Sequence, residues 1–465
     1  MHCKGRRDLR RPGRSGRSIG IHTGSLHVKL KTVRKRHVIA GFSTVTHSAS
    51  QRLTDRIARI TVTHPPPAEV FTAEVAIVGA GPAGLVSAIA LAAAGVDTLL
   101  IASPAQMDHR TTALLAGSVA ALDTLGVWEG CVPHAAPLKK LRIIDDTRRL
   151  FRAPEVLFTA AEIDCDAFGY NIENRHLIAA LEARAATLPL TWIAAPALAI
   201  ECDASAVTIK HGQGEARVQL AIGADGARSV CRAAAGITTR RRAYPQTALT
   251  LNLSHARPHD DTSTEFHTEQ GPFTLVPLPG RRSSLVCVVA PAQCDELLAK
   301  DDAELSNAIE SRSHWLLGNI TVEAGRGVFP LAVETADAVA RNRIALVGEA
   351  AHVVPPIGAQ GLNLGLRDAA SIAEIVAEAH QHKRDVGGAE VLARYESQRR
   401  ADIVSRTLAI DLLNRSLLSE LLPAHGARGL SLYFVDRIGP LRRVLMRESV
   451  MPAASQPKLM RGEMV

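Results

Sequence analysis

The stretch VAIVGAGPAGLVSAIALAAAGVDTLLIA, from Val75 to Ala102, decides the fold of this chain. It is apolar and long enough to raise the question of a membrane span, but the Gly-Ala-Gly-Pro turn near its start and Asp97 near its end argue against one. The alternative is a buried strand at 75–78, a helix of small residues at 82–94 and a second buried strand at 98–101. This order of elements predicts a Rossmann-like α/β fold.

The glycines of this stretch indicate what the turn binds. Gly79, Gly81 and Gly84 form GxGxxG between the first strand and the helix. The first glycine allows a tight turn, the second lets the backbone approach a pyrophosphate, and the third permits close packing of helix on strand. The pattern predicts a dinucleotide site, although Ala102 and Ser103 stand where an acidic residue ordinarily binds the ribose.

Two further motifs follow the first. AIGADGARSVCRAAAG, residues 221–236, reads as a strand, an Asp-Gly turn containing Asp225, and a helical run. GEAAHVVPPIGAQGLNLGLRDA, residues 348–369, follows the strand RIALVG and has two carboxylates, one histidine, two prolines and four glycines. An Asp-Gly turn by itself is usually only a turn, so the second motif gains meaning from its neighbours.

Together, in this order and spacing, the three motifs resemble the group A flavoprotein monooxygenases, the family of p-hydroxybenzoate hydroxylase. Within that family, GAQGLNLGLRDA, GYNIENRHLIAAL (residues 169–181) and the C-terminal helices are most similar to the ubiquinone-biosynthesis hydroxylases. The resemblance covers roughly residues 73 to 445.

The resemblance implies an α/β fold: a Rossmann-like FAD-binding domain, an inserted, mostly β substrate domain, and C-terminal helices. Period-two patterns in LKKLRIIDD (138–146) and RRLFRA (148–153), and a hairpin around Pro279-Gly280, agree with the inserted domain. We expect the FAD-binding domain at 71–137, 169–239 and 331–425, the substrate domain at 138–168 and 240–330, and a C-terminal helix and tail at 426–465.

The resemblance also implies the residues that hold a tightly bound FAD. Pro355 and Pro356 would line the flavin ring, and Glu349 stands where the family usually has Asp. His352 is expected to orient neighbours or fill the core, so no acid or base residue and no metal is assigned. The implied cofactor-binding residues are Gly79, Gly81, Gly84, Arg110, Arg175, Asp225, Glu349, Gly361, Leu362 and Asn363, with Arg175 equally readable as a solvent-facing helix residue.

The activity implied is hydroxylation of an aromatic ring with NAD(P)H and O2 through a C4a-hydroperoxyflavin. NAD(P)H would dock transiently, because the sequence has a single GxGxxG. The expected substrate is a polyprenyl phenol of ubiquinone biosynthesis, and the alternative is a soluble hydroxylase of small phenolic compounds. Two other classes stay open: a flavin reductase or dehydrogenase that never uses O2, and a non-flavin protein that binds nucleic acid.

The net charge of +8 is concentrated at the N-terminus, where residues 1–70 hold about 15 Lys/Arg and about 3 Asp/Glu. This leader lacks apolar periodicity and reads as disordered. It is a nucleic-acid or membrane-surface arm, a targeting peptide, or sequence upstream of the natural start. We favour the third, with Val62 as a candidate start, and expect no nucleic-acid partner, since only 3% of residues are aromatic.

Cysteine and histidine patterns bear on compartment and metals. Seven scattered cysteines without CxxC, and eighteen histidines without HExxH, favour a reducing compartment and no metal site. We therefore expect a cytoplasmic protein. The run at 412–447 mixes apolar and basic residues, so peripheral contact with the inner face of the membrane, or a place in a quinone-biosynthesis complex, stands beside an ordinary packed helix.

Overall fold

The computed structural model describes residues 69–104, 108–147, 152, 154–356, 358–418, 437–450 and 456–465. The basic leader, most of the predicted strand at 148–153 and residues 419–436 of the C-terminal run lie outside these ranges. The described residues form one compact unit.

The opening motif folds as its sequence pattern predicts. β1 (Glu69–Val78) is followed by α2 (Pro82–Ala93) and then by β2 (Thr98–Ile101), and all four residues of β2 are buried. β1 lies parallel to β2, with Val75 opposite Thr98. The continuous apolar run is therefore a buried parallel strand pair with its crossover helix, because strands covered on both faces need no polar alternation.

The first sheet has eight strands in the order β18-β19-β11-β1-β2-β8, and β10 pairs with both β11 and β9. β19, β11, β1, β2 and β8 run parallel to one another. Its further strands are β8 (Leu190–Ile193), β9 (Ala197–Cys202), β10 (Val207–His211), β11 (Gly214–Gly223), β18 (Ala340–Arg341) and β19 (Ile344–Leu346).

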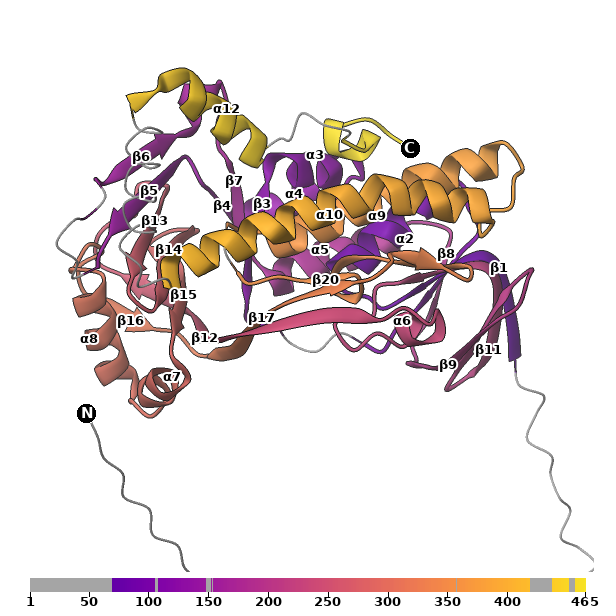
Figure 1. Cartoon of the computed structure of the whole chain (residues 1–465), viewed down its shortest axis with the longest axis horizontal. Helices are drawn as coiled ribbons and strands as arrows, with labels where there is room; N and C mark the ends of the chain where they lie inside the picture. The colour runs from indigo at the N-terminus through magenta and orange to yellow at the C-terminus, as the bar shows by residue number, and fades with distance from the viewer. Residues whose placement is uncertain are drawn as a thin grey trace, which may run out of the picture. The chain divides into compact units, whose positions relative to one another are not determined.

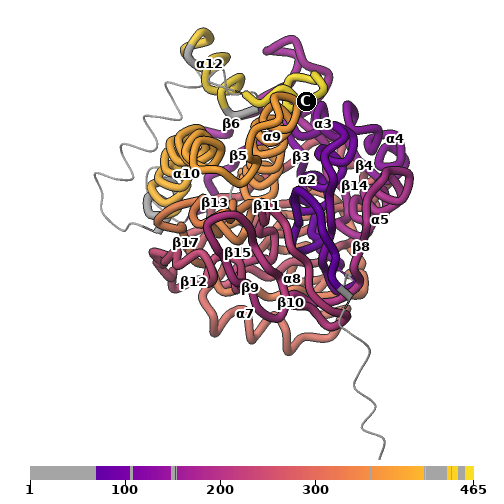
Figure 2. Tube along the Cα trace, turned by 90° about the vertical axis from the view of Figure 1, so that its right-hand side faces the viewer, coloured from indigo at the N-terminus to yellow at the C-terminus, as the bar shows by residue number. Residues whose placement is uncertain are grey.

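Four helices lie side by side next to this sheet, in the order α10, α9, α2, α5 (Figures 1 and 2). Their apolar faces and the parallel strands share one large buried core. α10 also contacts β14 (Gly271–Leu278) and β17 (Gly327–Ala336) of the second sheet. The further helices of this part are α3 (Ala116–Thr124), α4 (Trp128–Cys131), α5 (Asn174–Ala185), α6 (Val230–Ala234), α9 (Gln360–Gln381) and α10 (Ala389–Leu418).

The second sheet has nine strands in the order β20-β17-β12-β15-β14-β13-β5-β6, with β16 paired to β12. One face packs against α7 (Pro291–Leu298) and α8 (Asp302–Arg312) in a separate apolar core. The strands are β5 (Lys140–Asp145), β6 (Val156–Thr159), β12 (Thr239–His255), β13 (Thr262–Thr268), β14 (Gly271–Leu278), β15 (Arg282–Val289), β16 (Ile320–Val322), β17 (Gly327–Ala336) and β20 (His352–Val353).

This arrangement confirms the predicted fold class, a Rossmann-like α/β part joined to a mostly β part. The hairpin expected around Pro279-Gly280 is formed by β14 and β15. β17 continues to Ala336 and β20 also joins the second sheet, so that sheet draws strands from both sides of the expected boundary at residue 330. The division into domains stays a prediction.

Smaller elements complete the unit. A three-stranded sheet contains β3 (Thr111–Leu115), β4 (Ala135–Pro137) and β7 (Gly169–Glu173) in the order β3-β7-β4. α12 (Gly439–Val450) and the 3-10 turn η4 (Lys458–Arg461) stand near the C-terminus. Within the described residues, no helix combines the length and apolar character that crossing a membrane requires.

Candidate functional site

The three sequence motifs meet at one edge of the parallel sheet. They follow β1, β11 and β19, which are adjacent, so their turns emerge side by side at the carboxyl ends of the strands. The Ala224 N–H donates to the Val78 carbonyl at 2.8 Å, and the Val347 N–H donates to the Gly223 carbonyl at 2.9 Å. Backbone hydrogen bonds therefore fix the three turns relative to one another.

The glycines of the first motif divide into two kinds. Gly79 has φ +108°, and a methyl group there would lie 2.4 Å from the Ala224 carbonyl oxygen. A methyl group on Gly84 would lie 2.0 Å from the Gly79 carbonyl oxygen. A methyl group on Gly81, by contrast, would meet nothing within 4 Å, and this residue is exposed at the start of α2. The first and third glycines serve packing, and Gly81 leaves free space before a helix N-terminus, where an anion is favoured.

The third motif turns beside the same helix. Gly348 has φ +60°, and a methyl group there would lie 3.5 Å from the Ala83 Cβ. A methyl group on Gly365 would lie 3.0 Å from the Gly348 Cα. The loop therefore packs closely against α2 and α9. Glu349, in the short 3-10 turn η3 (Gly348–Ala350), is exposed. A carboxylate is thus presented next to the glycine turn.

A buried network of polar and charged side chains, centred on Asp368, is hydrogen-bonded to the backbone of this loop. Asp368 has no exposed side-chain surface; its Oδ2 accepts from the Gly348 N–H at 3.0 Å and lies 2.6 Å from His352 Nε2. Arg399 Nε donates to Asp368 Oδ1 at 2.8 Å. Burial would raise the pKa of Asp368, but the charges and hydrogen bonds of His352 and Arg399 outweigh it and hold the pKa below its ordinary value. His352 therefore has a buried carboxylate partner.

The network continues to the start of α9. Arg399 Nη1 donates to Asp402 Oδ2 at 2.7 Å, and Asp402 Oδ1 accepts from Arg406 Nε at 2.7 Å. Arg406 Nη1 donates to Gln360 Oε1, in the first residue of α9, at 3.2 Å. The loop that carries Glu349 and the N-terminus of α9 are consequently linked through one chain of charges.

The α9 N-terminus presents backbone donors rather than side chains. Asn363 is buried, and its amide donates to the Ala113 and Ala359 carbonyls while its Oδ1 accepts from the Leu115 N–H and Ser118 Oγ. These four bonds use the whole capacity of the amide. A ligand at this end would meet the backbone N–H groups of the first turn, where Gly361 is exposed and Leu362 half-buried.

The two prolines before α9 differ in exposure: Pro355 is buried and Pro356 is exposed. Both precede the left-handed residues Gly358 and Ala359, with φ +62° and +54°. The chain is therefore stiff on one side of the turn and tightly bent on the other.

One carboxylate oxygen of Asp225, in the second motif, has no hydrogen-bond partner. Its Oδ2 accepts from the Cys231 N–H at 3.0 Å. Its Oδ1 is buried and has no hydrogen-bond partner. An unpaired buried carboxylate oxygen is costly, so this atom calls for a donor from a bound molecule. The helical run after this turn begins at Val230, with Ser229 as its N-cap.

Arg110 lies close enough to Glu349 for their charges to interact. Its guanidinium donates to both oxygens of Asp108, at 2.8 Å to Oδ2 and 2.9 Å to Oδ1, and Asn174 Nδ2 donates to Asp108 Oδ2 at 2.8 Å. The Asp108 hydrogen bond, with a smaller contribution from the Glu349 charge, raises the pKa of Arg110 above its ordinary value. Arg110 also lies over the Phe329 ring, 5.4 Å from its centroid, and is half exposed.

Two residues stand outside the three turns: Arg175, a predicted contact, and Ser103, which follows β2 where an acidic residue is ordinarily found. Arg175 is half exposed at the start of α5, where Nη2 donates to Glu173 Oε1 at 3.0 Å, and no contact among the described residues joins it to the three turns. Ser103 is exposed just past the end of β2. The residues brought together are therefore Gly79, Gly81, Gly84, Arg110, Asp225, Glu349 and the first turn of α9.

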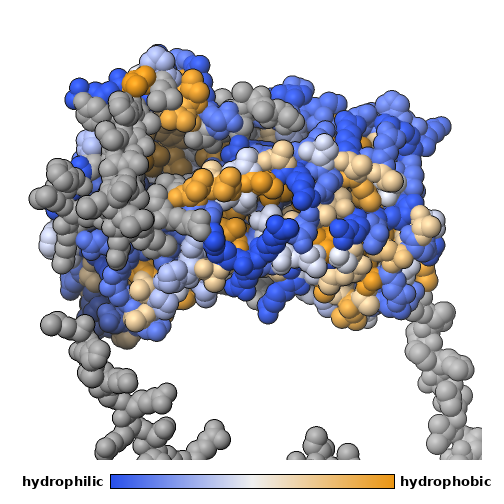
Figure 3. Space-filling view, in the orientation of Figure 1, coloured by the Kyte–Doolittle hydropathy of each residue, from blue (hydrophilic) through white to orange (hydrophobic). Residues whose placement is uncertain are grey.

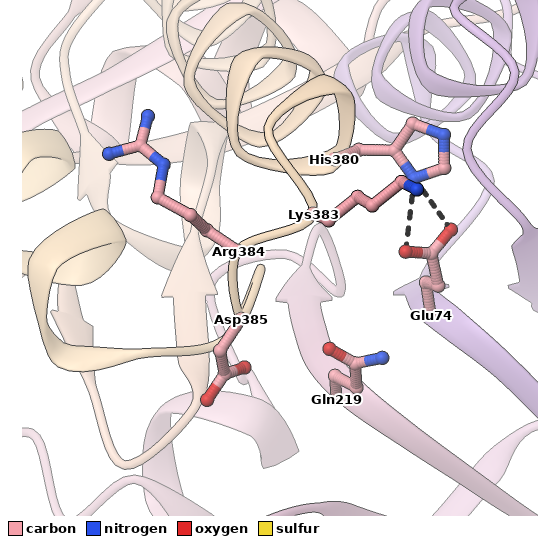
Figure 4. Close-up of a pocket in the computed structure, with 6 residues that line it drawn as sticks. All are labelled: Glu74, Gln219, His380, Lys383, Arg384 and Asp385. Atoms are coloured by element: carbon pink, nitrogen blue, oxygen red, sulfur yellow. Dashed lines mark hydrogen bonds and ion pairs between the residues drawn. The ribbon is translucent and has the colours of Figure 1, made fainter.

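A cavity of about 340 Å³ lies elsewhere. It is lined by Glu74, Gln219, His380, Lys383, Arg384 and Asp385 (Figure 4), and His380 pairs with Glu74 at 2.9 Å. His380 stands in the last turn of α9, whose 22 residues span about 30 Å. The cavity therefore lies far from the three turns and plays no part in the candidate site.

Sequence reasoning did not identify three residues that shape the site: Asp108, Asn174 and Asp368. Asp108 stands two residues before Arg110, and Asp368 lies inside the third motif, so both were visible as acids beside predicted residues. Asn174 had no such signal, because its contact with Asp108 joins segments 66 residues apart.

A helix N-terminus with free space, an unpaired Asp225 oxygen and an exposed Glu349 fit a dinucleotide, whose pyrophosphate is anionic and whose sugar hydroxyls donate hydrogen bonds. The Rossmann-like sheet and these turns define a dinucleotide-binding protein. The chain belongs to the family of the FAD binding domain, whose model matches residues 72–408.

Similar proteins place the chain more closely. It is 35% identical over 404 residues to the ubiquinone hydroxylase UbiL of Rhodospirillum rubrum, covering 84% of this chain and 93% of that protein. It is 31% identical over 387 residues to the 3-demethoxyubiquinol 3-hydroxylase of Escherichia coli, covering 80% and 97%. The resemblance to the flavoprotein hydroxylases, and to those of ubiquinone biosynthesis within them, is confirmed.

Solved structures agree in fold. The p-nitrophenol 4-monooxygenase of Pseudomonas putida superposes with a TM-score of 0.68 at 20% identity, covering 83% of this chain and all of that one. HpxO of Klebsiella pneumoniae, in complex with FAD and uric acid, gives a TM-score of 0.64 at 20% identity and covers 80% and 97%. At this identity the likeness shows the fold alone.

Proposed function

We propose that this chain is an FAD-dependent monooxygenase that hydroxylates the aromatic ring of a polyprenyl phenol in ubiquinone biosynthesis, with NAD(P)H and O2 as co-substrates. The three adjacent strand-end turns, together with the exposed carboxylate of Glu349, carry the cofactor part of the proposal. The names of the relatives that match most of the chain carry the substrate part.

The residues at the three turns divide the cofactor between them. Gly79, Gly81 and Gly84 would face the pyrophosphate with the α2 N-terminus, and Arg110 would add a positive charge. Asp225 and Glu349 would accept hydrogen bonds from sugar or ribityl hydroxyls. Pro355, Pro356 and the N–H groups of Gly361, Leu362 and Asn363 would lie along the flavin ring, and Arg175 is kept as a weaker contact.

Bound FAD supplies the redox chemistry, namely hydride acceptance from NAD(P)H and activation of O2 for transfer of one oxygen atom to the ring. The protein's own contribution is to bind, orient and exclude water. The N-terminus of α9 places partial positive charge where the reduced ring would be negative. The Asp368 network keeps Glu349 and that helix end in a fixed relation.

The decisive test uses the purified full-length chain. We expect a yellow protein that releases one FAD per chain on denaturation, and NAD(P)H oxidation that accelerates with a short-chain prenyl phenol. In ¹⁸O2, one labelled oxygen should appear in the product. A well-folded protein without flavin would refute the proposal, and acceleration by small phenolic acids alone would favour the alternative substrate class.

We also propose a cytoplasmic location with peripheral contact at the inner face of the membrane. On α12, Val444 is 63% exposed and Leu445 44% exposed, beside the exposed residues Arg443 and Arg447. Apolar surface over α12 and along α10 is visible on one face in Figure 3. Apolar side chains among arginines suit an anionic lipid surface.

Co-sedimentation with vesicles tests this contact. The protein should bind vesicles containing anionic lipid, and Val444→Asp with Leu445→Asp should lower the bound fraction several-fold. Val132→Asp, at a residue that is also exposed but lies near α4, is the matched control. Equal binding by both variants would count against α12 as the contact.

A further inference from the structure

One row of paired residues crosses the second sheet on the face away from α7 and α8. Its members lie opposite one another in register, one on each of six strands, and all are half-exposed: Gly327, Thr250, Val286, Thr274, Glu265 and Ile143. The residues that flank them along the strands, such as Leu285 and Phe266, point into the core beneath the two helices. We call these six residues the cross-sheet row.

Polar contacts cover the sheet on both sides of the row. On one side, Asn171 of β7 donates to the Pro277 carbonyl at 2.9 Å and to Ser284 Oγ at 3.1 Å. On the other, Asn414 of α10 donates to Gln246 Oε1 at 3.2 Å. The cross-sheet row is therefore a less covered strip between the three-stranded sheet and α10.

One end of the row adjoins the proposed flavin site. A methyl group on Gly327 would lie 2.8 Å from a ring carbon of Phe329. The Phe329 ring in turn lies under the Arg110 guanidinium, which interacts with the Glu349 charge. A substrate lying along the row would thus begin next to residues assigned to the cofactor.

Glu265 is the charged member of the row. Its Oε1 lies 2.8 Å from His267 Nε2, and its side chain is 18% exposed where that of His267 is 7% exposed. Within the described residues, no Arg or Lys forms an ion pair with Glu265. Arg282, on the same face, is occupied by Glu323 at 2.6 Å. His267 Nδ1 is buried without a partner.

We propose that Glu265, oriented by His267, selects the charge of the substrate. Its carboxylate would accept a hydrogen bond from a neutral ring hydroxyl and would repel a carboxylate on the ring, since no Arg or Lys within the described residues pairs with it. The site is therefore built for an uncharged phenol and against a hydroxybenzoate. This inference rests on the proposed function and narrows its substrate class.

The test is a pair of probes of similar size, 4-methylphenol and 4-hydroxybenzoate, with binding to the flavin-loaded enzyme measured by equilibrium dialysis. We expect the wild-type protein to bind 4-methylphenol at least tenfold more tightly. Glu265→Gln should reduce that ratio about tenfold, mainly by improving 4-hydroxybenzoate binding. Glu265→Asp, which keeps the charge, should keep the preference.

Glu296→Gln is the matched control, because Glu296 is exposed on α7, which covers the opposite face of the same sheet. It should leave the ratio unchanged. A wild-type ratio near one, or the same ratio in wild type and Glu265→Gln, would overturn the inference.

Dialysis requires no turnover, so the two proposals can fail separately. An enzyme that binds the probes with this preference but hydroxylates no phenol would overturn the proposed function and support the binding preference. An enzyme that hydroxylates phenols without any charge preference would overturn only the role of Glu265.

Discussion

Asp368 accepts a hydrogen bond from the backbone N–H of Gly348 at 3.0 Å, with no exposed side-chain surface on the acid. The residue after Gly348 is Glu349, the exposed carboxylate of the candidate site. A buried charge twenty residues along the chain from Gly348 therefore sets the backbone from which Glu349 extends. Buried support and exposed contact are thus separate side chains, and substitutions can distinguish them.

Asp368→Asn should destabilise the protein by about 3 kcal/mol or more, because it leaves the Arg399 charge with one fewer buried counter-charge. Urea unfolding of the flavin-free protein measures this. Asp123→Asn makes the same chemical change at an exposed position of α3 and should stay within about 0.5 kcal/mol of wild type. Similar losses of unfolding free energy in both variants would show that the buried network contributes no more to stability than an exposed carboxylate does.

Acid should weaken the fold through the same network. Burial would raise the pKa values of Asp368 and Asp402, but the neighbouring cations outweigh it and both values are lowered. Groups with depressed folded pKa values contribute stability above their unfolded pKa near 4, and that contribution is lost as the pH falls through the folded value. We expect stability to be level from about pH 7 to 5 and to fall below about pH 4. Urea midpoints across this range should fall less steeply for Asp402→Asn; identical slopes would contradict the assignment.

Gly81→Ala should separate cofactor binding from folding. Nothing lies within 4 Å of the added methyl group, so the flavin-free protein should keep its stability to within about 1 kcal/mol. The methyl group would stand where the pyrophosphate is expected, so the dissociation constant for FAD should rise at least tenfold, as flavin fluorescence would show. Gly79→Ala, which meets the Ala224 carbonyl at 2.4 Å, should instead lower stability itself. Wild-type FAD affinity in Gly81→Ala would remove the pyrophosphate from this turn.

Glu349→Gln should weaken FAD binding about tenfold, since a hydrogen bond to a charged acceptor contributes about 1.5–3 kcal/mol. Because Glu349 is exposed, the loss of folding stability should stay within about 0.5 kcal/mol. Arg228→Ala, at an exposed residue beside the second motif, serves as the comparison and should retain more flavin. Equal flavin content after gel filtration would exclude Glu349 from the site.

The parts of the fold carried by local turn chemistry were predictable from sequence. Gly79 and Gly84 indicate a strand-to-helix turn because no other residue fits beside Ala224 and Gly79, and Pro279-Gly280 indicates a hairpin in the same way. The parallel pairing of β13 with β5, which places Glu265 opposite Ile143, joins segments more than a hundred residues apart. Such pairing depends on tertiary packing, so the cross-sheet row was not foreseen.

The site residues also divide into those that local motifs identify and those that depend on tertiary packing. Glu349 and Asp225 stand in motifs and were named from sequence, although their roles toward FAD stay predictions. The Asp108 contact with Asn174 and the saturation of the Asn363 amide depend on which surfaces meet, and no spacing in the sequence encodes them.

β17 gives the molecule a practical constraint for protein engineering. This ten-residue strand starts at Gly327 in the cross-sheet row and ends at Ala336, whose N–H donates to the Ala351 carbonyl at 2.8 Å, just past Glu349. A chimaera that takes its second sheet from a relative would have to be joined within β17 or include the whole of this strand from the relative. A joining point beyond Ala336 would transfer the second sheet together with the hydrogen bond that aligns it with the loop carrying Glu349. A joining point inside β17 would make that alignment depend on how the two halves of one strand fit together.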